Sequence, residues 1–131
     1  MRVPTELTGT RVTRTAFDHQ VRLSFTGHEP DGRVRVDGEL VVETPLLLTD
    51  ASGRQALLTP GSGVALAPLL GLFARTVTGV QVTGAGALTL DFDDGTLLRV
   101  DPDPDHESWA LTGRGIASVL VGPGGEPHGW H

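Results

Sequence analysis

The sequence lacks several residue types, and each absence excludes something. There is no cysteine, so disulfides and thiolate chemistry are excluded. There is also no lysine, asparagine or tyrosine, so every basic residue is arginine. The formal net charge of −6 argues against nucleic acid as a partner, because phosphate binding needs clustered cations. Arg33 and Arg35 share one side of a predicted strand, but two arginines do not form a basic patch.

Long apolar runs are also missing. None approaches the roughly 20 residues that span a bilayer, and the N-terminal residues lack the apolar core of a signal peptide. A chain without cysteine suits a reducing compartment. We therefore expect a cytoplasmic protein that does not contact a membrane.

Glycine and proline, in contrast, are abundant, with 18 Gly and 9 Pro. They interrupt helices and make tight turns, which favours many short strands. A chain of 131 residues, 38% of them hydrophobic, is long enough for one domain with its own core. We therefore expect a single domain over residues 1–131.

Alternation of apolar and polar residues predicts the strands. Val21, Leu23 and Phe25, for example, share one face, and Asp94-Gly95 is a strong hairpin signal. Residues 27–32 and the tail after residue 122 have the composition of loops. Residues 33–43 form one bent strand or two. The predicted strands are 12–17, 20–25, 33–43, 46–49, 55–58, 77–83, 87–92, 96–100, 108–112 and 118–122.

Between residues 64 and 75 the period changes to three and four residues, which indicates one side of an α-helix of two to three turns. Pro68 suits the first turn of such a helix. The apolar side of the predicted helix carries Leu66, Leu69, Leu70 and Phe73.

The two halves of the chain resemble each other. Residues 43–63 align without a gap on residues 106–126, 21–25 matches 88–92, and 12–15 resembles 77–80. We therefore predict a mainly β (α+β with one helix) fold from an internal duplication, with pseudo-repeats 11–63 and 76–126. It would consist of two similar antiparallel β-meander units around a shared core, joined by one short helix at about 64–75. The alternative is that any two β-meanders look alike, and different strand orders in the two halves would favour that alternative.

The most distinctive motif is D-P-D-P-D, in which Asp101, Asp103 and Asp105 alternate with prolines. A calcium loop of the EF-hand type needs Gly and Glu where this chain has His106 and Thr112. Proline also favours polyproline II, in which side chains two apart diverge. We expect a stiff, solvated acidic elbow that binds no metal, and no cofactor.

The elbow, the hairpin carboxylates Asp93 and Asp94, and Glu107 would form one acidic surface if the hairpin folds over the elbow. Such a surface attracts a basic partner; the alternative is ordinary loop solvation. Trp109 is expected in the core, matching Leu46 of the first half. Trp130 either packs the tail or is an exposed contact residue.

Catalytic signatures are missing. His106, Glu107 and Ser108 are consecutive, but neighbours on a strand face opposite sides and form no relay. No G-x-S-x-G, H-E-x-x-H or Walker motif is present. We assign no catalytic residues.

Several runs of the sequence resemble one family. They are F-D-D-G-T-L-L-R-V-D-P-D-P-D-H-E-S-W, the segments Glu43–Asp50 and Ala67–Leu72, and G-P-G-G-E before a near-terminal Trp. Together they are similar to a family of small actinobacterial proteins classed as a domain of unknown function. Only the long 27–39 loop departs from it. The resemblance implies a fold and a source, but no activity.

Three functions therefore remain open. The first is a non-catalytic protein-binding module, immunity-like in neutralising a toxin partner through the acidic surface. The second is a small-molecule or carbohydrate-binding domain, with enzymatic activity left open, whose site lies between the two β units. The third is a structural homodimer formed through an exposed strand edge.

Overall fold

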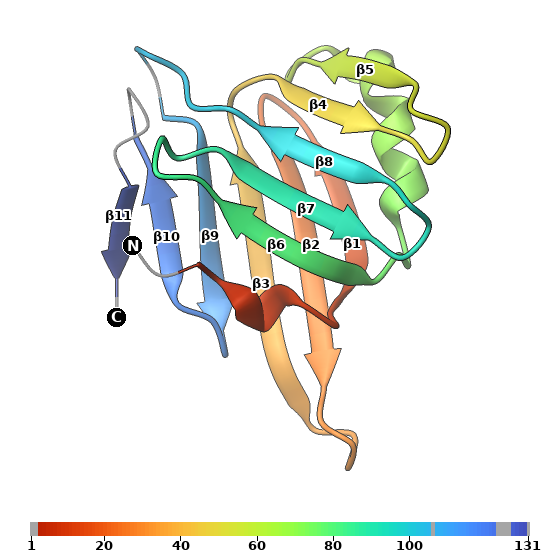
Figure 1. The fold of residues 1–131 in the computed structure, drawn as a ribbon, viewed down its shortest axis with the longest axis vertical. Helices are drawn as coiled ribbons and strands as arrows, with labels where there is room; N and C mark the ends of the chain where they lie inside the picture. Colours follow the sequence, from red (N-terminus) through yellow and green to blue (C-terminus); the bar gives the residue numbers. More distant parts are fainter. Residues whose placement is uncertain (1–2, 106, 123–126, 131) are drawn as a thin grey trace.

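The protein is a sandwich of two antiparallel sheets in a computed structural model (Figure 1), which describes residues 3–105, 107–122 and, for the backbone alone, 127–130. One sheet has the order β1-β2-β3-β9-β10-β11 and the other β5-β4-β8-β7-β6. The mainly β prediction is confirmed. The strands are β1 (Arg11–Phe17), β2 (Val21–His28), β3 (Val34–Val42), β4 (Leu46–Thr49), β5 (Gln55–Leu58), β6 (Val77–Val82), β7 (Leu88–Phe92), β8 (Leu97–Val100), β9 (Trp109–Arg114), β10 (Ser118–Val121) and β11 (Pro127–Trp130).

Two predicted loops are partly strand. β2 continues to His28, and β3 runs as one strand through Asp37 and Gly38, paired on both sides. The tail, predicted to be a loop, contains β11, which pairs with β10. Its sequence shows no alternation, so its strand character comes from pairing with the edge of β10.

The predicted α-helix over 64–75 is instead a 3₁₀ helix, η2 (Gly63–Leu72), and a second short one, η1 (Thr5–Leu7), precedes β1. The buried residues of η2 are Leu66, Leu69 and Leu72, which follow the three-residue period of a 3₁₀ helix. Pro68 lies inside η2 rather than in its first turn. Neither helical segment of the described chain has the length and apolar character needed to cross a membrane.

The core lies between the sheets, where the inward residues of both form one continuous cluster. Val21, Leu23 and Phe25 are fully buried, as their alternation predicts. Trp109 is also buried, as predicted, and its indole Nε1 donates a hydrogen bond of 2.9 Å to the carbonyl oxygen of Gly86.

The two halves have the same strand order but exchange strands. β1, β2 and β3 are followed by β9 and β10, and β6, β7 and β8 by β4 and β5. Register agrees too: Val42 pairs with Trp109, and Val100 pairs with Leu46. Each sheet therefore combines strands from both halves of the chain. This differs from the prediction, in which each half forms a unit of its own. Equal strand order and register are compatible with the predicted duplication.

Candidate functional site

The acidic elbow, residues 101–105, lies in the connection between β8 and β9 and is fixed at its base by Ser108. This side chain is fully buried, and its Oγ accepts a 2.8 Å hydrogen bond from the backbone N–H of Asp103. The Ser108 N–H donates to Val121 O, and the Ser108 carbonyl accepts from the N–H of Glu43, both at 2.9 Å. The elbow is thereby joined to both the end of β3 and the end of β10.

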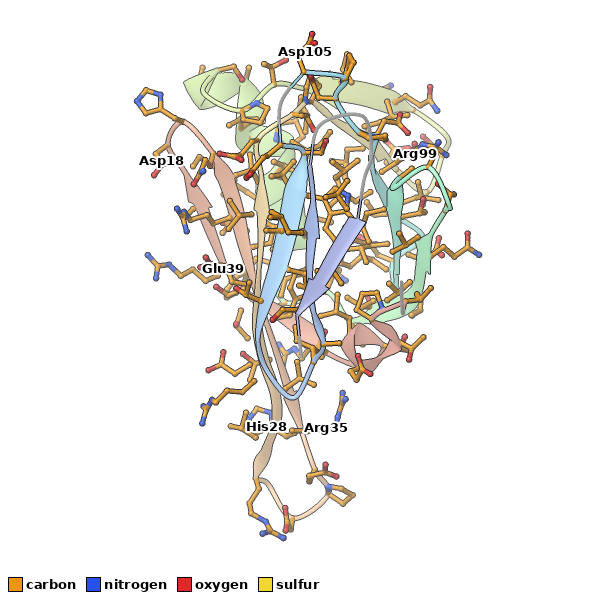
Figure 2. The ribbon with its side chains drawn as sticks, turned by 90° about the vertical axis from the view of Figure 1, so that its left-hand side faces the viewer. Asp18, His28, Arg35, Glu39, Arg99 and Asp105 are labelled. Atoms are coloured by element: carbon orange, nitrogen blue, oxygen red, sulfur yellow. The ribbon has the colours of Figure 1, made fainter. Side chains whose placement is uncertain are left out.

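Within the elbow, the carboxylates engage neighbouring groups. Asp101 forms an ion pair of 2.9 Å with Arg99, and both side chains are largely exposed. Asp103 Oδ1 accepts a 2.8 Å hydrogen bond from the N–H of Asp105. Asp105 is exposed at the end of the molecule (Figure 2). The described residues contain no group of three His, Asp or Glu side chains that could hold a metal ion.

Beside the elbow, an open hollow of about 670 Å³ is lined by Asp18, His19, Gln20, Glu43 and Glu107. Gln20 connects two of its carboxylates. The backbone N–H of Gln20 donates to Asp18 Oδ1 at 2.8 Å, and its Nε2 donates to Glu43 Oε1 at 2.6 Å. Carboxylates from three separate connections thus meet at one hollow.

Arg22, on β2, is engaged with Gln20 and Glu39 and not with the carboxylates that line the hollow. Arg22 donates to Gln20 Oε1 at 2.6 Å and forms a 2.9 Å ion pair with Glu39. Arg22 and Arg99 are engaged with Glu39 and Asp101, and the exposed carboxylates of Asp18, Glu43 and Glu107 give the hollow a negative surface. In Figure 2, Asp18 and Asp105 lie at this same end, and His28 and Arg35 lie toward the other. We call this surface the acidic end; its carboxylates are those of Asp18, Glu43, Asp101, Asp103, Asp105 and Glu107.

Asp93 and Asp94, predicted to join the elbow, do not lie there. They precede β8, whereas the elbow follows it, so the two groups are at opposite ends of that strand (Figure 1). Asp94 Oδ1 accepts a 3.0 Å hydrogen bond from the N–H of Thr96, and Oδ2 lies 3.7 Å from Arg75 Nε. Burial raises the pKa of Asp94, but hydrogen bonds from Thr96 and the charge of Arg75 outweigh it and leave the pKa lowered. Asp94 therefore closes a turn.

The other predicted site residue, Trp130, lies in β11, but its side chain is outside the described part of the structure. Sequence reasoning missed Asp18, His19, Gln20 and Glu43. A signal existed for Glu43, because the repeat alignment places it opposite His106, next to Glu107. Only the exchange of strands between the sheets, however, brings the two connections together.

The space between the sheets is filled by the core cluster. A mainly apolar groove of about 350 Å³ opens elsewhere, beside η2.

The fold and the site together define a small two-sheet β-sandwich domain with one acidic end. The model of a family described as "Family of unknown function (DUF6188)" matches residues 3–131, so the chain belongs to that family. The resemblance to an uncharacterised domain family is confirmed at this level. Comparisons with curated proteins and with solved structures found no match.

Proposed function

We propose that this protein is a non-catalytic protein-binding module whose acidic end receives a basic segment of a partner protein. The observation that supports the proposal most is the hollow in which Asp18, Glu43 and Glu107 meet, next to the exposed elbow. A surface with one sign of charge attracts a partner of the other sign and orients it before contact.

The way the acidic end is held also supports binding. Ser108 fixes the elbow, and Gln20 fixes the carboxylates of Asp18 and Glu43, through hydrogen bonds of 2.6 to 2.8 Å. Groups that are ordered before binding lose less conformational entropy when the partner arrives. An arginine or lysine side chain of the partner fits the hollow, because carboxylates on several sides can accept its N–H groups.

A narrower form of the proposal is an immunity-like protein that neutralises a toxin by covering a basic surface on it. We further propose a cytoplasmic protein of an actinobacterium. The compartment is supported by the absence of cysteine, and the source by the resemblance of the D-P-D-P-D run and its flanking residues to small actinobacterial proteins. A small-molecule or carbohydrate site between the two β units receives less support, because that space is filled by the core.

The test is affinity capture from the native lysate with three baits, followed by mass spectrometry. The first bait is the wild-type chain, and the second carries Asp18→Asn, Glu43→Gln and Glu107→Gln. The third is a matched control with Glu29→Gln, Asp31→Asn and Asp37→Asn, which removes as much charge from the β2–β3 hairpin. We expect one basic partner to be captured by the first and third baits and lost with the second.

Two further measurements test whether the loss of capture is caused by the charge of the acidic end. Binding of the captured partner should weaken as salt is raised, because the charges involved are exposed to solvent. Equal thermal midpoints for the three baits would show that the fold is unchanged. Capture that survives in the second bait, or that falls equally in the second and third, would overturn the proposal.

A further inference from the structure

The outer side of η2 is apolar and uncovered. Residues 63–73 contain no polar side chain, and with three residues per turn every third one falls in the same row. The row of Leu66, Leu69 and Leu72 is buried. In the next row Val64 is 91% exposed and Leu70 is 55% exposed, and Phe73, which directly follows η2, is 57% exposed. In Figure 1, η2 is the green coil beside β4 and β5, with no described element over its outer side.

A groove lies next to this row. It has a volume of about 350 Å³ and an apolar lining of Leu48, Ala56, Pro68, Gly71 and Leu72. Pro68 and Gly71 belong to the third row of η2, adjacent to the row of Leu70. One short helix therefore carries exposed apolar side chains and one wall of an apolar groove.

The corresponding place in the other half is filled. There, a Cβ added to Gly38 would lie 2.8 Å from Cδ1 of Ile116, so Ile116 covers that position. In the alignment of 43–63 with 106–126, Gly53 stands where Ile116 stands, and nothing lies within 4 Å of a Cβ built on Gly53. Gly53 directly precedes Arg54, which lines the groove, so the groove has beside it no counterpart of the Ile116 side chain.

We propose that a second copy of this chain covers this face, with η2 packed on η2 about a twofold axis and Leu70 and Phe73 of each copy against the groove of the other. A twofold interface is self-complementary, because each patch meets its own copy. The exposed side chains and the groove lie next to each other on η2, so each of two copies related by a twofold axis can place its side chains in the groove of the other. This goes beyond the protein-binding role, because η2 and the elbow lie on different sides of the molecule (Figure 1).

Charge at the border of the groove favours a second copy over the basic partner proposed for the acidic end. Asp50, Asp94 and Arg54 line the groove, and Arg75 lies 3.7 Å from Asp94. Two acids and two bases can pair with their counterparts across a twofold axis. A partner with one sign of charge would meet charges of its own sign here.

The experiment is sedimentation equilibrium of the full chain over a range of concentrations. We expect wild type to approach twice the 13.8 kDa chain mass. Leu70→Asp and Phe73→Asp should each raise the dimer Kd roughly 30-fold or more, the effect of removing one central hot-spot side chain. Gly71→Leu should act in the same direction by filling the groove, since a Cβ at Gly71 meets nothing within 4 Å. The control Val34→Asp changes a similarly exposed apolar residue, 51% exposed on β3, and should leave the Kd unchanged.

A second measurement covers any variant that fails to fold. Because the chain has no cysteine, a single Leu70→Cys introduces the only thiol. Oxidation should give a disulfide-linked dimer, whereas Val34→Cys should stay monomeric. A wild-type chain that remains monomeric at every concentration would overturn the proposal. A dimer whose Kd rises with Val34→Asp but not with Leu70→Asp or Phe73→Asp would also overturn it.

Discussion

Arg11 and Thr76 form an isolated antiparallel bridge, and the alignment of the two halves makes them equivalent residues. The bonds around them come in matching pairs. Val12 N–H donates to Arg75 O at 3.0 Å and Val77 N–H to Thr10 O at 2.8 Å. A pair of equivalent residues that contact each other marks the position of a pseudo-twofold axis. The start of β1 and the start of β6 are therefore related by a local pseudo-twofold, which is compatible with the predicted duplication.

The same axis relates Gly9 to Ala74, and both have a positive φ, of 88° and 67°. The left-handed region costs a non-glycine residue about 1–2 kcal/mol in the folded state. Glycine avoids this strain, but its greater conformational entropy stabilises the unfolded chain and offsets part of the gain. We predict that Ala74→Gly raises the free energy of unfolding by about 0.5–1 kcal/mol. The matched change Gly9→Ala should lower the free energy of unfolding by about 1 kcal/mol, because alanine is strained at this positive φ. No steric clash adds to this loss, since the new Cβ would make only an ordinary contact, at 3.8 Å. Urea unfolding measures both, and a loss of stability in Ala74→Gly would contradict the prediction.

Gly38 and Ile116 form a second testable pair. A Cβ on Gly38 would lie 2.8 Å from Ile116 Cδ1, so Gly38→Ala should destabilise by about 1–3 kcal/mol through overpacking. Ile116→Val removes that Cδ1 atom and alone should cost about 0.5–1.5 kcal/mol. In the double variant the clash is relieved. The loss of unfolding free energy in the double variant should therefore be smaller, by at least about 0.5 kcal/mol, than the sum of the losses in the two single variants. Strict additivity in this double-mutant cycle would show that Ile116 does not restrict Gly38.

Ser108 is predicted to order the acidic elbow. Ser108→Ala removes the acceptor of the Asp103 N–H, so we expect a loss of about 1 kcal/mol in unfolding free energy. Amide hydrogen exchange of Asp103 should also become faster. The control Ser118→Ala makes the same change at a residue whose hydroxyl has no hydrogen bond within the described chain. An unchanged exchange rate at Asp103 would mean that the elbow is held by other contacts.

Much of the fold was predictable because its signals are local. Alternation reports which side of a strand is buried, so Val21, Leu23 and Phe25 could be placed in the core. The Asp94-Gly95 turn was predictable because glycine tolerates the positive φ, here 86°, that this turn requires.

Alternation does not report which strand lies beside which, so the exchange of β4 and β5 with β9 and β10 was not predictable. The acidic end depends on that exchange. Glu43 lies beside the elbow only because β3 pairs with β9, and Asp18 joins it through Gln20. The hairpin carboxylates Asp93 and Asp94 were misplaced for a different reason: β8 separates them from the elbow, so the two groups lie at opposite ends of that strand. The 3₁₀ form of η2 was missed because spacings of three and four fit an α-helix equally well.

Asp50 makes stability depend on pH in a predictable direction. Its Oδ1 accepts hydrogen bonds from Ser52 Oγ at 2.6 Å, Ser52 N–H at 2.9 Å and Arg54 N–H at 3.0 Å. The Ser52 hydroxyl is the largest cause that holds the pKa of Asp50 below its ordinary value of 3.8; the backbone N–H groups and the charge of Arg54 add to it against a smaller effect of burial.

A pKa that is lower in the folded chain than in the unfolded chain means that the ionised group stabilises the fold. This contribution is complete above the unfolded pKa and is lost as the pH falls through the folded pKa. Asp50→Asn keeps an acceptor oxygen but cannot ionise. We therefore expect the difference in unfolding free energy between wild type and Asp50→Asn to be largest at neutral pH and to shrink below about pH 4. Urea unfolding across that range measures it, and a difference that stays constant into strong acid would show that the charge of Asp50 does not contribute to stability.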